Sequence, residues 1–119
     1  MPRKPAPSAY LKPVVTSSRR SVVNVFGTSR ARQWRQPAGG TEAGLRAAQL
    51  QHQIARQLRA AILDSDAGNL AEFARRYDRL SYDRLRGIMK GDVWMRLEDV
   101  AEIAHLLDLV VKVSLENVS

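Results

Sequence analysis

The spacing of apolar residues changes in the middle of the chain, and from residue 41 onward it is helical. Apolar side chains recur there every four positions, as on one face of an α-helix: Leu50, Ile54, Leu58 and Ile62. Thr41 is a suitable N-cap, and Asp66-Ala67-Gly68 interrupts the pattern. We predict a helix over about residues 41–64, about 33 Å long at 1.5 Å per residue. Because this exceeds the needs of a small domain, we expect its first half to extend outward or to contribute to a dimer.

Three shorter helical patterns follow the long one. Asn69 precedes the first, with Glu72 three residues later, which is similar to a capping box. Ser81 is the expected N-cap of the second, which should end at Gly91. The expected inward-facing residues are Leu70, Phe73, Ala74 and Tyr77, then Leu85, Ile88 and Met89, then Leu97, Val100, Ile103, Ala104 and Leu107. The sequence therefore predicts a mainly α domain over residues 41–119, a bundle of four to five helices.

Both ends of the chain depart from helical spacing. Residues 1–40 begin with a proline-rich stretch and close with Pro37-Ala38-Gly39-Gly40, so we expect a largely extended or disordered arm. Within it, the valines of residues 14–26 favour a short strand or hairpin. Residues 110–115 alternate like a half-buried C-terminal strand. The valines of the arm pair either with one another or with this tail, within one chain or between two.

Charge divides the chain at the same place. The sequence has 19 Lys and Arg against 12 Asp and Glu, for a net charge of +7. Residues 1–40 hold eight of the basic residues and no acidic one, so a basic arm precedes a nearly neutral domain. Such a balance favours a polyanionic partner, either nucleic acid or an acidic membrane surface. There is neither an apolar run of about 20 residues nor a secretory leader, so we expect a cytoplasmic protein without a membrane span.

The sequence offers little for catalysis. Its two histidines, His52 and His105, lie on different helices, and we expect His105 to be partly buried in the core. Cysteine is absent, and Glu98 and Asp99 are adjacent on a helix and so point apart. No glycine-rich phosphate loop is recognisable. We expect no enzymatic activity, cofactor, metal or small-molecule substrate.

The second and third predicted helices are typical of a helix-turn-helix. Ala74 allows two helices to cross closely, and Leu85 and Ile88 anchor the second of them to the core. At these positions the chain resembles the lambda-repressor/Cro-like, or Xre-type, regulators over residues 54–116. The resemblance rests on Phe73-Ala74, Leu80-Ser81, Leu85, Ile88, Gly91 and residues 97–107. The turn departs from the family pattern: it is one residue longer and has Asp78 in place of the usual glycine. Met89 also replaces a frequent glutamate.

The resemblance implies that the second helix of the pair enters the DNA major groove. It assigns base reading to Tyr82, Asp83, Arg86 and Gly87, with Arg86 pairing with guanine and Gly87 allowing the backbone to approach DNA. It assigns phosphate binding to a set of basic residues: Arg75, Arg76, Arg79, Arg84 and Lys90.

The arm has a basic cluster with an aromatic residue inside it. Arg30, Arg32 and Arg35 surround Trp34, which suits contacts to the DNA backbone or the minor groove. The alternative is a solubilising tail.

We expect a sequence-specific regulator that binds double-stranded DNA as a homodimer, in particular a phage-type repressor that occupies an operator. The alternatives are an antitoxin that binds a toxin protein and autoregulates its promoter, an architectural protein without sequence preference, and a helix pair that serves packing alone.

Overall fold

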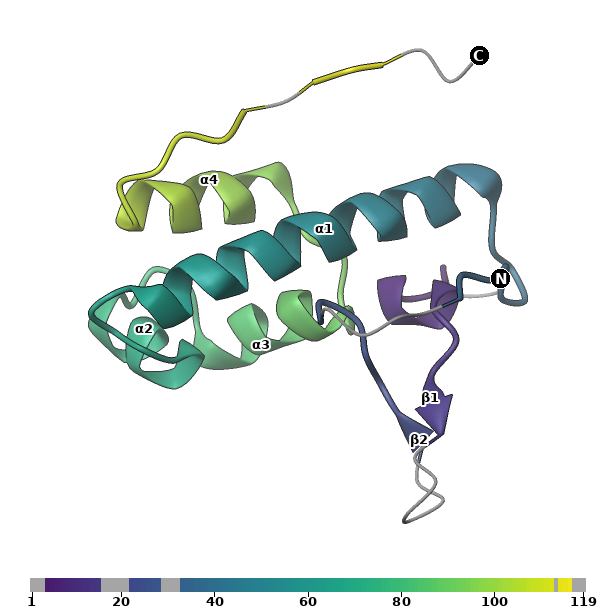
Figure 1. The fold of residues 1–119 in the computed structure, drawn as a ribbon, viewed down its shortest axis with the longest axis horizontal. Coiled ribbons are helices and arrows are strands. Elements are labelled where there is room, and N and C mark those ends of the chain that lie inside the picture. Colours follow the sequence, from purple (N-terminus) through teal and green to yellow (C-terminus); the bar gives the residue numbers. More distant parts are fainter. Residues whose placement is uncertain (1–3, 16–21, 29–32, 113, 117–119) are drawn as a thin grey trace.

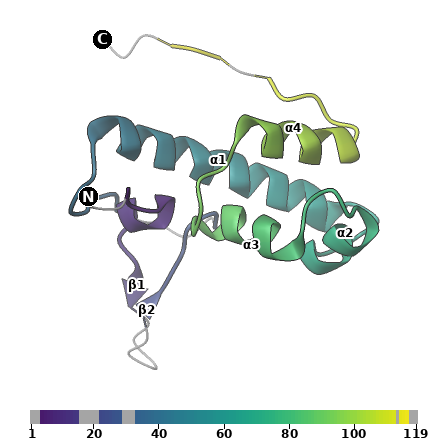
Figure 2. The same cartoon turned by 180° about the vertical axis from the view of Figure 1, so that it is seen from behind.

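The computed structural model describes residues 4–15, 22–28, 33–112 and 114–116. In these ranges the elements are η1 (Pro7–Tyr10), β1 (Val14–Val15), β2 (Val22–Val23), α1 (Glu42–Asp64), α2 (Leu70–Arg76), α3 (Tyr82–Lys90) and α4 (Leu97–Leu106). The protein is thus mainly α, as predicted. Helix α1 crosses the molecule, with α4 along one side and α2 and α3 along the other (Figure 1), and the view from behind agrees (Figure 2).

Helix α1 has the predicted bounds because its ends follow local rules. The Thr41 side chain accepts a hydrogen bond from the Gly44 N–H at 2.9 Å, and beyond Asp64 the Ser65 N–H donates to the Ile62 carbonyl. The face turned to the core is formed by Ala48, Gln51, Ala55, Leu58 and Ile62. Leu50, which we expected on the apolar face, is instead 59 % exposed.

The main core lies where α1, α2, α3 and α4 meet. Leu85 and Ile88 of α3 are fully buried in it together with Phe73 of α2 and Ile103 of α4. The inward orientation predicted for these residues is confirmed. Leu97, at the first position of α4, is the exception: its side chain is 87 % exposed.

The described parts of residues 1–40 pack against the helices, so the disordered alternative that we considered for an extended or disordered arm is wrong for them. Tyr10, Leu11, Val25 and Phe26 are each at most 2 % exposed, and η1 lies against α1. Burial of these aromatic and aliphatic side chains stabilises the folded arrangement of the segment, although its proline content suggested otherwise. The boundary expected at residue 40 therefore does not separate a free arm from the helical domain.

The valines of the N-terminal segment pair with one another in an antiparallel hairpin. Val14 is opposite Val23, and Val15 is opposite Val22. The predicted hairpin is confirmed. The C-terminal tail, by contrast, has no strand at residues 109–112 or 114–116, where it is exposed. It leaves α4 on the side away from α3 (Figures 1 and 2), where the described chain offers no neighbouring strand to complete its hydrogen bonds.

Candidate nucleic-acid interface

Helices α2 and α3 are each fixed at the N-terminus by a side-chain cap. The Asn69 side chain accepts from the Glu72 N–H at 2.8 Å, and the Ser81 hydroxyl oxygen accepts from the Arg84 N–H at 3.1 Å. Gly91 then ends α3 with φ +76°, in the left-handed region that favours glycine. All three predicted helix boundaries are confirmed.

The outer face of α3 presents polar side chains to solvent. Tyr82 is 43 % exposed, and Asp83, Arg86 and Lys90 are also exposed. Among the residues that the structure describes, the Arg86 guanidinium and the Lys90 ammonium have no ion-pair or hydrogen-bond partner. Four of the predicted DNA-contacting residues therefore share one open helical surface.

Gly87 borders the exposed face of α3 but is covered by the chain after the helix, so the expectation that it faces outward is wrong. It is buried, and a Cβ atom built on it would lie 3.2 Å from the Val93 side chain. Its carbonyl accepts hydrogen bonds from the N–H groups of Gly91 and Asp92. The missing side chain makes room for the chain that turns back after α3.

Arg84 also points into the protein. Its guanidinium donates to the Asp99 carboxylate at 2.6 Å and to the Trp94 carbonyl at 3.3 Å, and its side chain is only 25 % exposed. Asp99 also accepts from the Arg96 N–H at the start of α4. Arg84 thus joins α3 to α4, and the outward position expected for it is wrong.

The other basic residues near α2 remain exposed but have acidic neighbours. Both Arg75 and Arg76 form ion pairs with Glu72, and the Arg79 Nε lies 3.7 Å from the Glu102 Oε1. Hydrogen bonds from Arg75 and then Arg76 lower the pKa of Glu72 from 4.5 to about 2. Because the folded-state pKa is lowered, these pairs stabilise the protein above about pH 4.5, and the contribution is lost as pH falls toward 2.

If these residues form the predicted DNA interface, Glu72→Gln should increase binding to duplex DNA of any sequence. The amide removes the negative charge that holds Arg75 and Arg76, so both guanidinium groups become available to phosphates. Each new phosphate contact should steepen the fall of log affinity with log salt by about 0.9. Anisotropy titrations at several salt concentrations measure this slope. Glu98→Gln makes the same charge change on α4; an equal effect there would contradict the release of Arg75 and Arg76.

The cluster predicted in the arm is only partly described. Arg30 and Arg32 lie outside the described residues. Trp34 forms a β-bridge with Leu11 and packs edge-on against His52. The Arg35 side chain is exposed but donates to the Ala9 carbonyl at 3.1 Å. In the described part, these side chains hold the N-terminal segment together.

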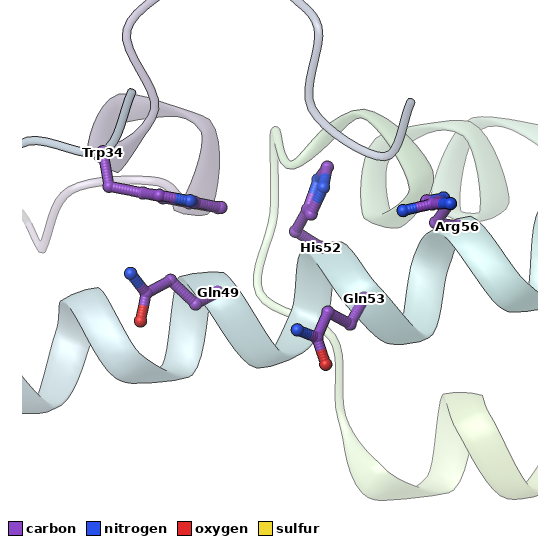
Figure 3. A pocket seen from close by; sticks show the side chains of 5 residues that line it. All are labelled: Trp34, Gln49, His52, Gln53 and Arg56. Atoms are coloured by element: carbon purple, nitrogen blue, oxygen red, sulfur yellow. The ribbon is translucent and has the colours of Figure 1, made fainter. Parts of the chain in front are cut away.

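A pocket of about 350 Å³ lies on the surface of α1, next to Trp34 of the N-terminal segment. The α1 residues that line it are Gln49, His52, Gln53 and Arg56. His52 lies between Trp34, which comes from the N-terminal segment, and Arg56 of α1 (Figure 3). His52 is 7 % exposed, and its Nδ1 accepts from the Gly27 N–H at 2.8 Å. Since this imidazole already joins α1 to the N-terminal segment, we interpret the pocket as a contact region between these two parts of the chain and not as a ligand site.

The burial predicted for His105 is wrong. His105 is exposed, whereas His52 is buried. Within the described ranges, no group of three His, Cys, Asp or Glu side chains could hold a metal ion. No helix in that part of the chain is long and apolar enough to cross a membrane.

Two polar residues with structural roles near α3 were missed. The side chain of Gln51 in α1 bonds to the backbone at the end of α3 and in the following loop, and Asn24 donates to the Lys90 carbonyl. Gln51 has a sequence signal, since it lies in phase with Ala48, Ala55 and Leu58. A polar residue inside an apolar stripe indicates a buried hydrogen-bonding role.

Comparison with known proteins adds no family assignment, since no family model, curated protein or solved structure significantly matches the chain.

Proposed function

We propose that the protein is a non-enzymatic, sequence-specific regulator that binds double-stranded DNA through a helix-turn-helix formed by α2 and α3. The observation that carries the proposal is the open face of α3, where Tyr82, Asp83, Arg86 and Lys90 are exposed. The opposite face is held in the core by Leu85 and Ile88. A helix of this kind fits the major groove of B-DNA, which is about 12 Å wide.

The charged residues on this face have different expected roles in DNA binding. Arg86 has no acidic partner in the described structure and can donate two hydrogen bonds to guanine. Lys90, at the end of α3, suits a phosphate on the groove edge. Occupation of a promoter through these contacts would repress transcription. The proposal assigns base reading to Tyr82, Asp83 and Arg86, and it leaves out Gly87 because that residue is buried.

Arg86→Ala should relax sequence preference at one position of the DNA site. Selection from a randomised duplex library at near-physiological salt should give an enriched motif with the intact protein. In the variant, discrimination at one base pair should fall by about 1–3 kcal/mol. Arg59→Ala removes the same charge from an exposed position of α1 and should leave the motif unchanged.

Two outcomes would contradict this proposal. If the intact protein enriches no motif, and the intact protein and Arg86→Ala retain equal amounts of DNA, the architectural alternative is favoured. If Arg59→Ala and Arg86→Ala weaken binding equally on every sequence, Arg86 contributes only charge and reads no base.

We further propose that the regulator acts as a homodimer, since helix-turn-helix proteins usually bind paired half-sites. An apolar groove of about 500 Å³ runs between α1, α4 and the C-terminal tail. Leu50 and Val110 line it and remain 59 % and 86 % exposed. In the described residues 110–112 and 114–116 the tail backbone has no hydrogen-bond partner, so it is available to the same segment of a second copy, which would cover both apolar side chains.

Leu50→Lys should convert the dimer to a monomer, because it places a charge in the apolar groove. Sedimentation velocity measures the mass, and circular dichroism checks that the helices persist. Leu63→Lys is the matched control, since Leu63 is an exposed leucine of α1 outside the groove. A wild-type protein that is monomeric both free and on DNA would exclude the dimer.

A further inference from the structure

The C-terminal end of α3 is completed by residues from the N-terminal segment. The last carbonyls of a helix have no partner within the helix and need one from elsewhere. At the end of α3, the Lys90 carbonyl accepts from the Asn24 Nδ2 at 2.9 Å, and the Gly91 carbonyl accepts from the Ser8 N–H at 2.9 Å. Two separate parts of the N-terminal segment therefore bond to the same helix end.

The fit between these segments is close enough to fix their relative position. A Cβ on Gly91 would lie 2.8 Å from the Phe26 ring, and one on Gly27 would lie 2.5 Å from the Met89 carbonyl oxygen. Gly27 in turn donates to His52 of α1. The turn that contains Phe26 and Gly27 is thus held between α1 and the end of α3.

Asn24 uses both ends of its amide in this arrangement. Its Oδ1 accepts from the Phe26 N–H at 3.0 Å, which sets the direction of the side chain, and its Nδ2 then donates to Lys90. On the other side of α3, Arg84 bonds to Asp99 of α4. The helix is held from α4 through Arg84 and from the N-terminal segment at its last residue.

We propose that the N-terminal segment sets the placement of α3 on DNA, with Asn24 as a positioning residue. The inference rests on the proposed function. It gives the described part of the segment a role in sequence discrimination without contact to DNA. Loss of the bond to Lys90 would loosen the last turn of α3 and shift Arg86, one turn before it, relative to the base edges. The phosphate contacts, which tolerate small displacements, would persist.

The test compares Asn24→Asp with Gln33→Glu. The aspartate keeps the acceptor for the Phe26 N–H but replaces the donor to Lys90 with a second oxygen. Gln33→Glu makes the same charge change at an exposed side chain of the N-terminal segment. The readouts are the ratio of affinities for the selected site and for random duplex, the salt dependence of binding, and the hydrogen exchange of residues 88–91.

Asn24→Asp should lower the affinity ratio about tenfold, leave the salt dependence equal to that of Gln33→Glu, and accelerate exchange at the end of α3. Gln33→Glu should keep the wild-type ratio and exchange rates. If Asn24→Asp does not fold, Asn24→Ala and Gln33→Ala repeat the comparison without a charge change. A folded Asn24 variant with the wild-type ratio would overturn this inference alone. A wild-type protein that selects no sequence would overturn the proposed function and this inference with it.

Discussion

Gln51→Ala should lower the free energy of unfolding by about 3 kcal/mol. Gln51 is 4 % exposed, and its side chain makes three hydrogen bonds to backbone groups beyond α1. The Nε2 donates to the Ile88 and Val93 carbonyls, each at 3.0 Å, and the Oε1 accepts from the Met95 N–H at 2.7 Å. Alanine would leave these groups without partners, at a cost of about 1–3 kcal/mol for each buried one, and would open a cavity.

Urea denaturation followed by circular dichroism measures the effect. Gln53→Ala is the matched control, because Gln53 is an exposed glutamine of the same helix, and it should change stability by less than about 0.5 kcal/mol. Equal stability of the two variants would show that the loop after α3 does not depend on the Gln51 amide.

Gly27→Ala should destabilise the protein by about 3 kcal/mol, well above the usual cost of a glycine replacement. Gly27 has φ +75°, where a side chain costs about 1–2 kcal/mol. In addition, its Cβ would lie 2.5 Å from the Met89 carbonyl oxygen, a backbone atom that cannot rotate away. The N-terminal turn would have to move off α3.

Gly68→Ala separates the two contributions. Gly68 has the same φ of +75°, but a Cβ there would meet nothing within 4 Å. It should therefore show only the conformational cost, about 1–2 kcal/mol. Thermal or urea unfolding of both variants gives the comparison. If both lose the same free energy, the contact between Gly27 and Met89 is not tight in solution.

The features that followed from the sequence are those set by neighbouring residues. Thr41, Asn69 and Ser81 cap their helices as predicted, because a cap depends on N–H groups two or three residues away. Gly91 ends α3 for a similarly local reason. The apolar spacing likewise identified the buried faces of α2 and α3.

The errors concern contacts between distant residues. Arg84 was expected to face solvent, but its partner Asp99 lies 15 positions away on another helix. Gly87 is buried because the chain after α3 turns back and places Val93 over it. Helical spacing alone contains no information on either contact. Of the α3 residues predicted to contact DNA, those whose exposure depends only on the helix face, such as Arg86, are the ones found in the open.

The error at the C-terminal tail is a contact that was expected but is absent from the described structure. Its alternating pattern was interpreted as a strand, but a strand requires a neighbour for its backbone. The valines that we considered as that neighbour pair within their own hairpin instead. The pattern records which side chains favour burial and does not identify what buries them.

The bond between Asn24 and Lys90 spans 66 positions, and the bond from the Trp94 Nε1 to the Pro5 carbonyl spans 89. These pairings join the N-terminal segment to the end of α3 and the loop after it, so their loop-closure entropy is lost late in folding and should slow it. On the ribosome, the N-terminal segment emerges first and must wait for most of the chain before its partners exist. A truncated product that stops before α3 would lack the groups against which Asn24 and Phe26 pack, and quality-control proteases would encounter it as an incomplete chain.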